Sequence, residues 1–294
     1  MLLFATDLDG TLLDRDGKVR PRDRRAIEEA RKNGVVVTIA TGRLTSGTHA
    51  IATDLGLDAP MVCGDGSITA CAATKRILHR RPIRIARVDE VLEAMSARKL
   101  ARFVFTPGAI HSCELGTRHH HYVSSWSPDI TTHAEVARAE AWRIDRDGVM
   151  MLLAIGDPDA IDDLALDMEK RGADLETLAF TLEHMRVRAA RFIVRGTSKG
   201  NALAAIAADL GIDRDSVAVA GDWYNDLSMF AWAGRSFAMP HAPADVKAEA
   251  TDVLSLDGDG GEGVADALER WLHDERNGVP DLANRVHSNI GAKR

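Results

Sequence analysis

Two aspartates follow a short apolar run close to the first residue of the chain. The run Leu2–Thr6 has the composition of a buried strand, and Asp7, Leu8, Asp9 and Gly10 come directly after it. Two carboxylates that stand two residues apart at a strand end can face one small volume, so this pair is a candidate for chemistry. An Asp-Gly turn after a strand is also a common structural feature. A calcium loop fits less well, because no helix flanks the segment and the ligand spacing stops after the second aspartate.

Two further segments carry groups that would favour an anion. Thr41 ends an apolar run and precedes Gly42, so a hydroxyl and an open backbone N–H could bind a phosphoryl oxygen. Lys199 opens an alanine-rich helical pattern, where its ammonium and the positive end of the helix dipole would act together. Each also has a plain structural interpretation, a helix cap for the threonine and a solvated surface charge for the lysine.

A fourth segment places two carboxylates and an amide on one loop after an apolar run. It reads Gly221, Asp222, Trp223, Tyr224, Asn225, Asp226. Oxygen ligands of this kind suit a hard cation such as Mg²⁺, which completes its shell with water and substrate oxygens. We therefore expect a Mg²⁺ site at this loop.

Short apolar strands that alternate with helical patterns are expected to position these segments. The expected strands are Leu2–Thr6, Val35–Ala40, Pro60–Cys63 and Ser216–Ala220, and the expected helices are Pro21–Asn33, Leu44–Leu55 and Gly200–Leu210. This alternation predicts an α/β core with a Rossmann-like, doubly wound parallel sheet. Ligands of such sheets bind outside the carboxyl ends of the strands, and three of the four segments fall there.

The middle of the chain has a different pattern of expected strands and helices, which predicts an inserted α+β domain. We expect the core to comprise residues 1–82 and 191–294 and the insertion to comprise residues 83–190. Within the insertion the expected strands are Ala101–Thr106, Ile110–Leu115 and Val149–Ile155, and the expected helices are Val88–Lys99 and Pro158–Arg171. The polar tail after about His273 is given no catalytic role.

Composition narrows the class of protein. The 294 residues are 45% hydrophobic and 28% charged, as in ordinary globular proteins. A formal net charge of -7 argues against nucleic-acid and anionic-membrane partners, which require a basic surface. No run reaches the roughly twenty apolar residues of a membrane span, and the first apolar run is too short for a signal peptide. With only three cysteines, which are read as structural thiols, we expect a cytoplasmic protein. The oligomeric state is not predicted.

The four segments, in this order, resemble the motifs of the haloacid dehalogenase superfamily of phosphatases. Within it they resemble the Cof-type subfamily, whose α/β cap is inserted between the second and third motifs. The resemblance covers roughly residues 1–82 and 191–272. It implies a Mg²⁺-dependent phosphohydrolase that removes phosphate from a small metabolite, such as a sugar phosphate or a phosphorylated cofactor, through an aspartyl-phosphate intermediate.

The resemblance also implies roles for individual residues. Asp7 would be the nucleophile and Asp9 the general acid and base. The backbone N–H of Leu8 is expected to face the phosphoryl oxygens. The other expected phosphate-binding residues are Thr41, Gly42, Lys199 and Asn225, and the expected metal ligands are Asp7, Asp9, Asp222 and Asp226.

Several positions depart from the family pattern and leave the substrate open. Asp65 stands where the family usually has asparagine, and His241 and Trp223 are also unusual. In the cap we expect the leaving group to be recognised by three side chains, those of His120, Tyr122 and Arg188. The run of three histidines at 119–121 is not expected to bind a metal, because consecutive side chains point in different directions.

Two other functions share parts of this residue pattern. A phosphomutase of related fold would use the same aspartates but return the phosphoryl group to its substrate. A receiver-like phosphate-sensing domain also offers a strand-end aspartate, a threonine, a lysine and Mg²⁺, but such domains are far shorter and carry no cap.

Overall fold

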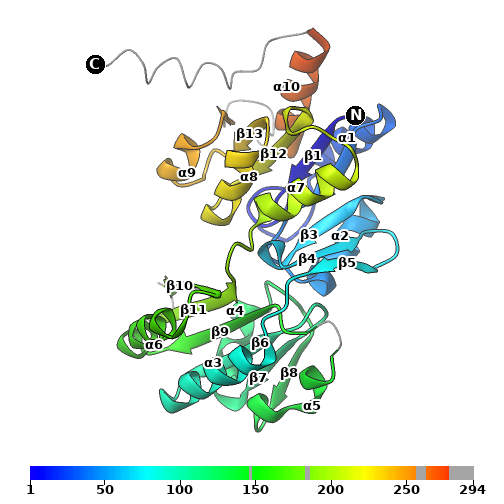
Figure 1. Cartoon of the computed structure of the whole chain (residues 1–294). Helices are drawn as coiled ribbons and strands as arrows, with labels where there is room; N and C mark the ends of the chain where they lie inside the picture. The colour runs from blue at the N-terminus through cyan, green and yellow to red at the C-terminus, as the bar shows by residue number, and fades with distance from the viewer. Residues whose placement is uncertain (146–147, 183–185, 256–262, 278–294) are drawn as a thin grey trace, which may run out of the picture.

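The computed structural model describes residues 1–145, 148–182, 186–255 and 263–277, and it divides into a core and a cap (Figure 1). The core is built on a parallel sheet in the order β14-β13-β12-β1-β2. Its strands are β1 (Leu3–Thr6), β2 (Val36–Ile39), β12 (Val217–Gly221), β13 (Arg235–Ala238) and β14 (Asp252–Val253). The α/β core with a parallel sheet is therefore confirmed.

Helices cover both faces of the core sheet. They are α1 (Pro21–Lys32), α2 (Thr45–Asp54), α7 (Lys199–Asp209), α8 (Leu227–Trp232), α9 (Ala244–Ala248) and α10 (Val264–Asn277). Successive residues of β1 point to opposite faces. Phe4 packs in a cluster with residues of α1 and α10, whereas Leu3 and Ala5 pack in a cluster with residues of α7 and α8. This two-sided burial explains why the core strands are continuous apolar runs.

A small antiparallel sheet extends the core at the edge of β2. It comprises β3 (Pro60–Cys63), β4 (Ile68–Cys71) and β5 (Ile77–Arg80). The bounds expected for β3 are confirmed, but its ladder runs antiparallel to β4. It meets the continuation of β2 through a single parallel bridge between Ala40 and Val62.

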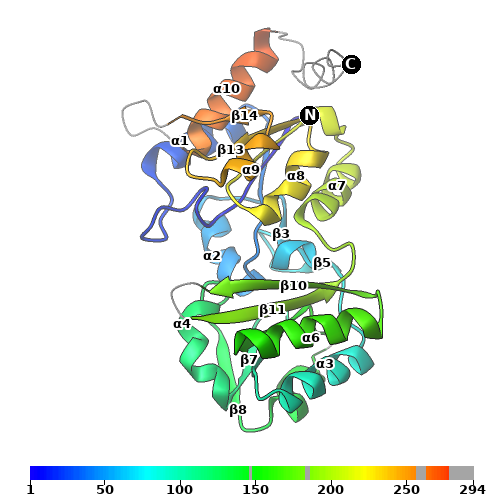
Figure 2. The ribbon, with the colours of Figure 1, turned by 90° about the vertical axis from the view of Figure 1, so that its left-hand side faces the viewer.

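The cap is a six-stranded sheet whose two longer helices cover one face. Its order is β10-β11-β9-β6-β7-β8. Its strands are β6 (Ala101–Phe105), β7 (Ile110–Cys113), β8 (Ile130–His133), β9 (Met151–Gly156), β10 (Leu175–Leu182) and β11 (Val187–Val194), and its helices are α3 (Ile85–Ala97), α4 (His120–Val123), α5 (Glu140–Arg143) and α6 (Pro158–Arg171). The longer helices α3 and α6 lie on the side of the sheet away from the core (Figure 2).

The hairpin of β10 and β11 was not predicted, and it changes the expected domain boundary. Residues 190 and 191 lie inside β11, which pairs with β10 as far as Val194. The chain therefore returns to the core after Val194. Arginines and alanines interrupt the apolar alternation of β11, so its sequence did not read as a strand.

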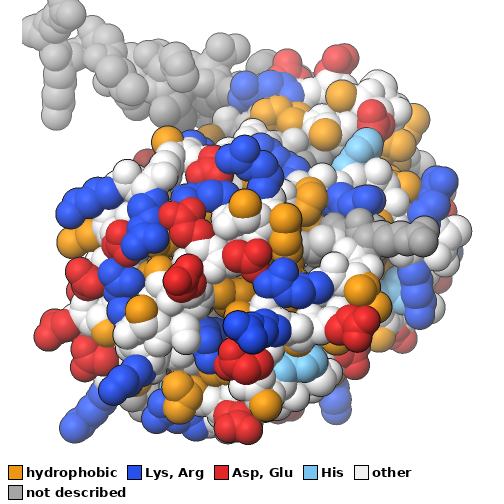
Figure 3. Space-filling view, turned by 60° about the horizontal axis from the view of Figure 1, so that its bottom comes forward, with side chains coloured by type: hydrophobic (Ala, Val, Ile, Leu, Met, Phe, Trp, Pro, Cys, Tyr) orange, Lys and Arg blue, Asp and Glu red, His pale blue; other side chains and the backbone are white. Residues whose placement is uncertain are grey.

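No helix in the described ranges has the length and apolar composition of a membrane span. The outer face of the cap carries interspersed acidic and basic side chains (Figure 3). Most of the polar tail, residues 278–294, lies outside the described residues.

Candidate active site

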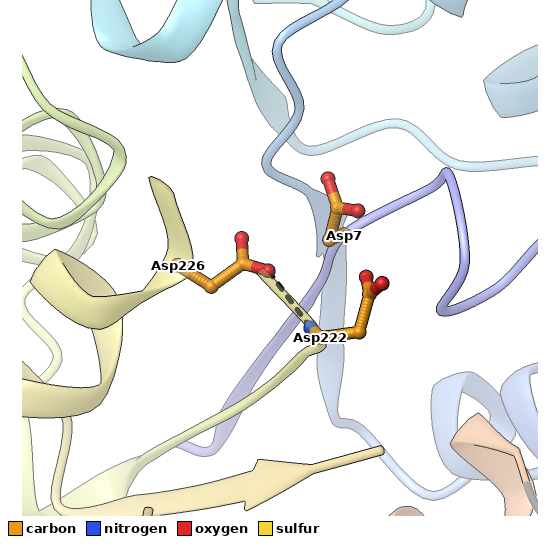
Figure 4. A group of neighbouring side chains, drawn as sticks. All are labelled: Asp7, Asp222 and Asp226. Carbon is orange, nitrogen blue, oxygen red and sulfur yellow. Dashed lines mark hydrogen bonds between the residues drawn. The ribbon is translucent and has the colours of Figure 1, made fainter. Parts of the chain in front are cut away.

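Three buried carboxylates meet at the carboxyl ends of two neighbouring strands. Asp7 follows β1 and Asp222 follows β12, and these strands pair in parallel with Thr6 opposite Ala220. Asp226 ends the turn that leads into α8. One oxygen of each carboxylate lies within 4.8 Å of one oxygen of each other carboxylate (Figure 4). The structure thus brings together three of the four carboxylates that were expected to bind a metal.

The backbone is shaped to let these carboxylates approach. At Gly10, where φ is +82°, a Cβ would lie 2.4 Å from an oxygen of Asp222. At Gly221 a Cβ would lie 2.5 Å from the carboxyl group of Asp226. Backbone N–H groups of Asp222 and Trp223 donate to Asp226 at 2.9 and 3.0 Å and fix its orientation.

Lys199 supplies a buried positive charge beside the carboxylates. Its Nζ donates to Asp7 and to Asp226, each at 2.7 Å, and its side chain is fully buried. Burial would lower the pKa of Lys199, but Asp226 and Asp7 outweigh it and hold that pKa above its ordinary value. Lys199 therefore stays charged.

One lysine does not balance three buried carboxylates. Burial raises the pKa of Asp7 well above its usual value, and the negative charges of Asp226 and Asp222 add to the rise against the opposing effect of Lys199. Burial and Asp226 likewise raise the pKa of Asp222, although the Thr11 hydroxyl donates to it at 2.8 Å. Three negative charges and one positive charge leave two negative charges, and the donors are all oxygens. This set fits a divalent hard cation such as Mg²⁺.

Asp9 does not join the carboxylate group. Its carboxylate is half exposed and accepts two hydrogen bonds from the guanidinium of Arg43, one of them at 2.7 Å from Nε. Such a bidentate pair fixes the direction of the side chain. Asp9, the expected general acid and base, is two residues from Asp7 in the chain. Its carboxylate binds Arg43 and is not part of the group formed by Asp7, Asp222 and Asp226. Arg43 was not among the expected site residues, although it follows Gly42 directly.

The expected phosphate-binding residues fall into two groups. Thr41 is buried at the end of β2, and its hydroxyl accepts from the N–H of Arg43 at 3.2 Å. Leu8 is buried, and its carbonyl accepts from Thr11 and Leu13. Leu8 directly follows Asp7 after β1, and Thr41 follows β2, the strand that pairs with β1. Asn225, in contrast, donates to Asp65 at 2.9 Å.

Asp65 connects the core to the cap at the edge of the site. It is buried in a left-handed conformation with φ 54°, and it accepts a hydrogen bond from Arg191 of β11. Burial would raise the pKa of Asp65, but Arg191 and Lys199 outweigh it and hold that pKa below its usual range. Among the described residues this is the only ion pair that joins the core to the cap strands and helices. The sequence pattern singled out Asp65 but gave it no role.

The structure brings one of the three expected cap residues to the core. Tyr122 is half-buried and packs edge-on against Trp126, and burial raises its pKa to about 12. His120 contacts the hydroxyl of Ser112 on β7 at 2.8 Å. Arg188 is paired with Asp162 of α6.

The placement of Arg188 corrects the expectation for that residue. It stands on the helix-covered face of the cap sheet, whereas Arg191, three residues further along β11, stands on the face toward the core. Residues an odd number of positions apart in a strand point to opposite faces. His241, the other unusual residue near the site, lies 3.4 Å from Asp222, and Trp223 is largely exposed.

Comparison with known proteins identifies the family of the chain. A sequence profile described as haloacid dehalogenase-like hydrolase matches residues 4–268. The pyridoxal phosphate phosphatase YbhA of Escherichia coli (strain K12) is 26% identical, over 92% of this chain and 97% of that protein. The HMP-PP phosphatase of Klebsiella pneumoniae (strain 342) is 25% identical, over 95% and 97%.

Among solved structures, a haloacid dehalogenase-like hydrolase from Bacteroides thetaiotaomicron is similar. It superposes with a TM-score of 0.78 over 92% of this chain and 98% of that one, at 21% identity. The match covers both the core and the cap. This chain belongs to the haloacid dehalogenase-like hydrolase family.

Proposed function

We propose that this protein hydrolyses the phosphate ester of a small metabolite through a covalent phosphoryl group on Asp7, with Mg²⁺ held by Asp7, Asp222 and Asp226. The observation that carries the proposal is the buried carboxylate group with Lys199 bonded to both Asp7 and Asp226. A nucleophilic carboxylate beside a fixed cation suits phosphoryl transfer, in which the protein mainly positions groups and stabilises charge. Bound Mg²⁺ would neutralise charge on the phosphoryl oxygens.

The first step moves the phosphoryl group to the protein. A carboxylate oxygen of Asp7 forms a bond to phosphorus, the ester bond breaks, and Asp9 gives its proton to the departing alcohol oxygen. Lys199 balances negative charge throughout, because it is buried and stays protonated. For the proton transfer, Asp9 has to exchange its contact with Arg43 for the leaving oxygen.

The second step returns the site to its starting state. Asp9 takes a proton from a water molecule, the water oxygen bonds to phosphorus, and the bond from phosphorus to Asp7 breaks. Thr41, Gly42 and the backbone N–H of Leu8 are proposed to hold the phosphoryl oxygens in both steps. The two related proteins are named for pyridoxal phosphate and HMP-PP. We therefore include phosphorylated cofactors with sugar phosphates as candidate substrates.

A cytoplasmic location belongs to the same proposal. Support comes from the free thiols of Cys63, Cys71 and Cys113, which fit a reducing compartment.

The test is release of free phosphate from a panel of phosphorylated metabolites in the presence of Mg²⁺. Asp7→Asn should lower kcat by at least about a thousandfold while the protein stays folded, because the amide has the shape of the carboxylate but is no nucleophile. Asp16→Asn, at an exposed position, serves as the matched control and should act like the parent. Turnover of Asp7→Asn within tenfold of the parent would exclude the covalent mechanism. Phosphoryl return to substrate without free phosphate would indicate a mutase.

A further inference from the structure

A cap loop places an indole beside the turn that is proposed to bind phosphate. The backbone carbonyl of Trp126 accepts from the N–H of Leu44 at 2.8 Å. Gly47 permits this approach, since a Cβ there would lie 2.7 Å from that carbonyl oxygen. The indole Nε1 lies 3.5 Å from the position that a Cβ on Gly42 would take. The ring is thus held against the Thr41 and Gly42 turn by contacts of its own backbone.

Arg191 approaches the same turn from the cap sheet. The place of a Cβ on Gly42 is also 3.1 Å from Oδ1 of Asp65, whose other oxygen accepts from Arg191. Tyr122 packs edge-on against Trp126 with ring centroids 5.1 Å apart. The positive charge of Arg191 also lowers the pKa of the Tyr122 phenol, against the larger effect of burial. Trp126, Tyr122 and Arg191 therefore form one group, called here the cap subsite.

Two N–H donors of the cap subsite have no acceptor among the described residues. One is the indole N–H of Trp126, whose described hydrogen bonds involve only its backbone. The other is Nε of Arg191, which is buried and without a partner. A buried donor without an acceptor, such as Nε of Arg191, costs about 1–3 kcal/mol, so it is normally satisfied by a ligand or by water. The cap subsite is therefore equipped to bind an acceptor atom.

The strand surface that continues from Arg191 is apolar. In the β10 and β11 ladder Arg191 is opposite Leu178, Ala189 is opposite Phe180, and Val187 is opposite Leu182. Directly opposed residues of an antiparallel pair share one face. Phe180, Leu182 and Val187 are only partly buried, and Leu178 is exposed. On this face of the described hairpin, residues 178, 180, 182, 187, 189 and 191 carry no carboxylate, amide or hydroxyl.

Such surroundings suit a flat ring better than a polyol. Each hydroxyl of a sugar loses a water partner on binding and needs a protein partner in exchange, which this apolar surface does not provide. Aromatic rings pack favourably against other rings, edge-on or offset. The two free donors would be satisfied by an acceptor on the ring.

We infer that the cap subsite takes an aromatic or heteroaromatic leaving group that carries a hydrogen-bond acceptor, so that the substrate is the phosphate ester of a ring-bearing alcohol. This inference rests on the proposed phosphatase reaction at Asp7. It assigns leaving-group recognition to Trp126 and Arg191, with Tyr122 supporting the indole.

The test compares three phosphate esters of primary alcohols, which differ in the leaving group but not in the kind of bond that is broken. They are 3-pyridylmethyl phosphate, benzyl phosphate and glucose 6-phosphate, with acetyl phosphate as a minimal substrate. We expect kcat/KM for the pyridylmethyl ester to exceed that for glucose 6-phosphate by at least about tenfold, with the benzyl ester between them. Equal or better turnover of glucose 6-phosphate would overturn the inference.

Variants then identify the residues. Trp126→Ala should lower the ratio of kcat/KM for the pyridylmethyl ester to that for acetyl phosphate by at least about tenfold. Trp126→Phe keeps a ring without the donor, so it should retain the preference for rings and lose the advantage of the pyridyl over the benzyl ester. Arg191→Gln should lower the same ratio, whereas Arg188→Gln, on the opposite face of β11, should act like the parent. Unchanged ratios in both Trp126 variants would also overturn the inference.

The outcomes separate this inference from the proposed function. Turnover of acetyl phosphate without a preference for rings would exclude the cap subsite and leave the reaction at Asp7 standing. Absence of phosphate release from the three esters and from acetyl phosphate would count against both.

Discussion

At the scale of single residues, the charges at the site decide how this protein binds a metal. The carboxylates of Asp7, Asp222 and Asp226 are buried together, and burial raises the pKa of Asp7 and Asp222. Their mutual repulsion destabilises the fold, and a cation that binds only the folded state removes it. Metal binding should therefore raise the free energy of unfolding, which can be measured without an assay of turnover.

We expect Mg²⁺ to raise the melting temperature of the parent. At a concentration of about one hundred times Kd, the gain in the free energy of unfolding is about 2.7 kcal/mol. Asp222→Asn removes one anionic ligand, so most of this Mg²⁺-dependent increase should be lost. Thermal unfolding with Mg²⁺ and with a chelator measures both. Asp215→Asn, at an exposed position, should keep the full increase, and an equal increase in Asp222→Asn would contradict the metal site.

The sequence predicted the convergence of the motif aspartates, because their strands are neighbours in a parallel sheet and both segments follow a strand end. It did not predict which way Asp9 turns, since that depends on Arg43 from another strand end. The sequence also led to Arg188, and not Arg191, as the arginine expected to recognise the leaving group. The two arginines differ only in which face of β11 they occupy, and this depends on a strand pairing that the sequence did not reveal.

At the scale of elements, a close approach of backbone to backbone sets the position of Lys199. The turn after β3 packs against the first residues of α7. A Cβ on Gly66, where φ is +97°, would lie 2.1 Å from the carbonyl oxygen of Ser198. Lys199 begins the helix directly after that carbonyl. The glycine therefore lets the turn hold the lysine against Asp7.

We expect Gly66→Ala to lower the free energy of unfolding by about 3 kcal/mol or more, because backbone has to move in addition to the strain of a positive φ. Gly211→Ala is the control, since its φ is +66° but a Cβ there meets nothing within 4 Å. It should cost only about 1 kcal/mol, from strain alone. Urea unfolding measures the difference between the two variants. Equal costs would show that the approach of Gly66 to Ser198 does not stabilise the fold.

Elements with a regular pattern were predicted well and the cap hairpin was not. The bounds of α6, Pro158–Arg171, are as expected, because Asp157 caps the helix and apolar residues recur along one face. The strands β10 and β11 pair over eight residues each, yet Arg188 and Arg191 interrupt the apolar pattern. Tertiary partners, Asp162 and Asp65, make each arginine compatible with its strand.

At the scale of the whole molecule, the cap is closed on the core by contacts on two sides of the site. On one side, the segment at the start of α2 bonds to the cap: Leu44 to Trp126, Thr45 to Pro107 and Ser46 to Ser127. On the other side stands the pair of Asp65 and Arg191. The two sets of contacts couple the stability of the cap to that of the core.

The coupling across the second side can be measured with a double-mutant cycle on Asp65→Asn and Arg191→Gln. Both side chains are nearly buried, with 9% and 14% of their surfaces exposed, so each single change leaves a buried charge without its partner and should cost about 3 kcal/mol. The double variant should cost less than the sum of the singles by about 1–3 kcal/mol. Arg191 outweighs burial and lowers the pKa of Asp65, so this stabilisation is present above the ordinary carboxyl range and is lost only as pH falls through the lowered pKa. The coupling should therefore be the same at about pH 6 and about pH 8.

Arg188 and Asp162 supply the control cycle for the same measurement. Their pair lies within the cap and is partly exposed, at 28% and 52%, so its coupling should stay below about 1 kcal/mol. Urea unfolding of both sets of variants, followed by two probes to check for a single transition, gives the energies. A coupling for Asp65 and Arg191 no larger than that of the control would show that this ion pair does not hold the cap on the core. In that case the other described contacts between cap and core, among them those of Leu44, Thr45 and Ser46, would hold the cap in place.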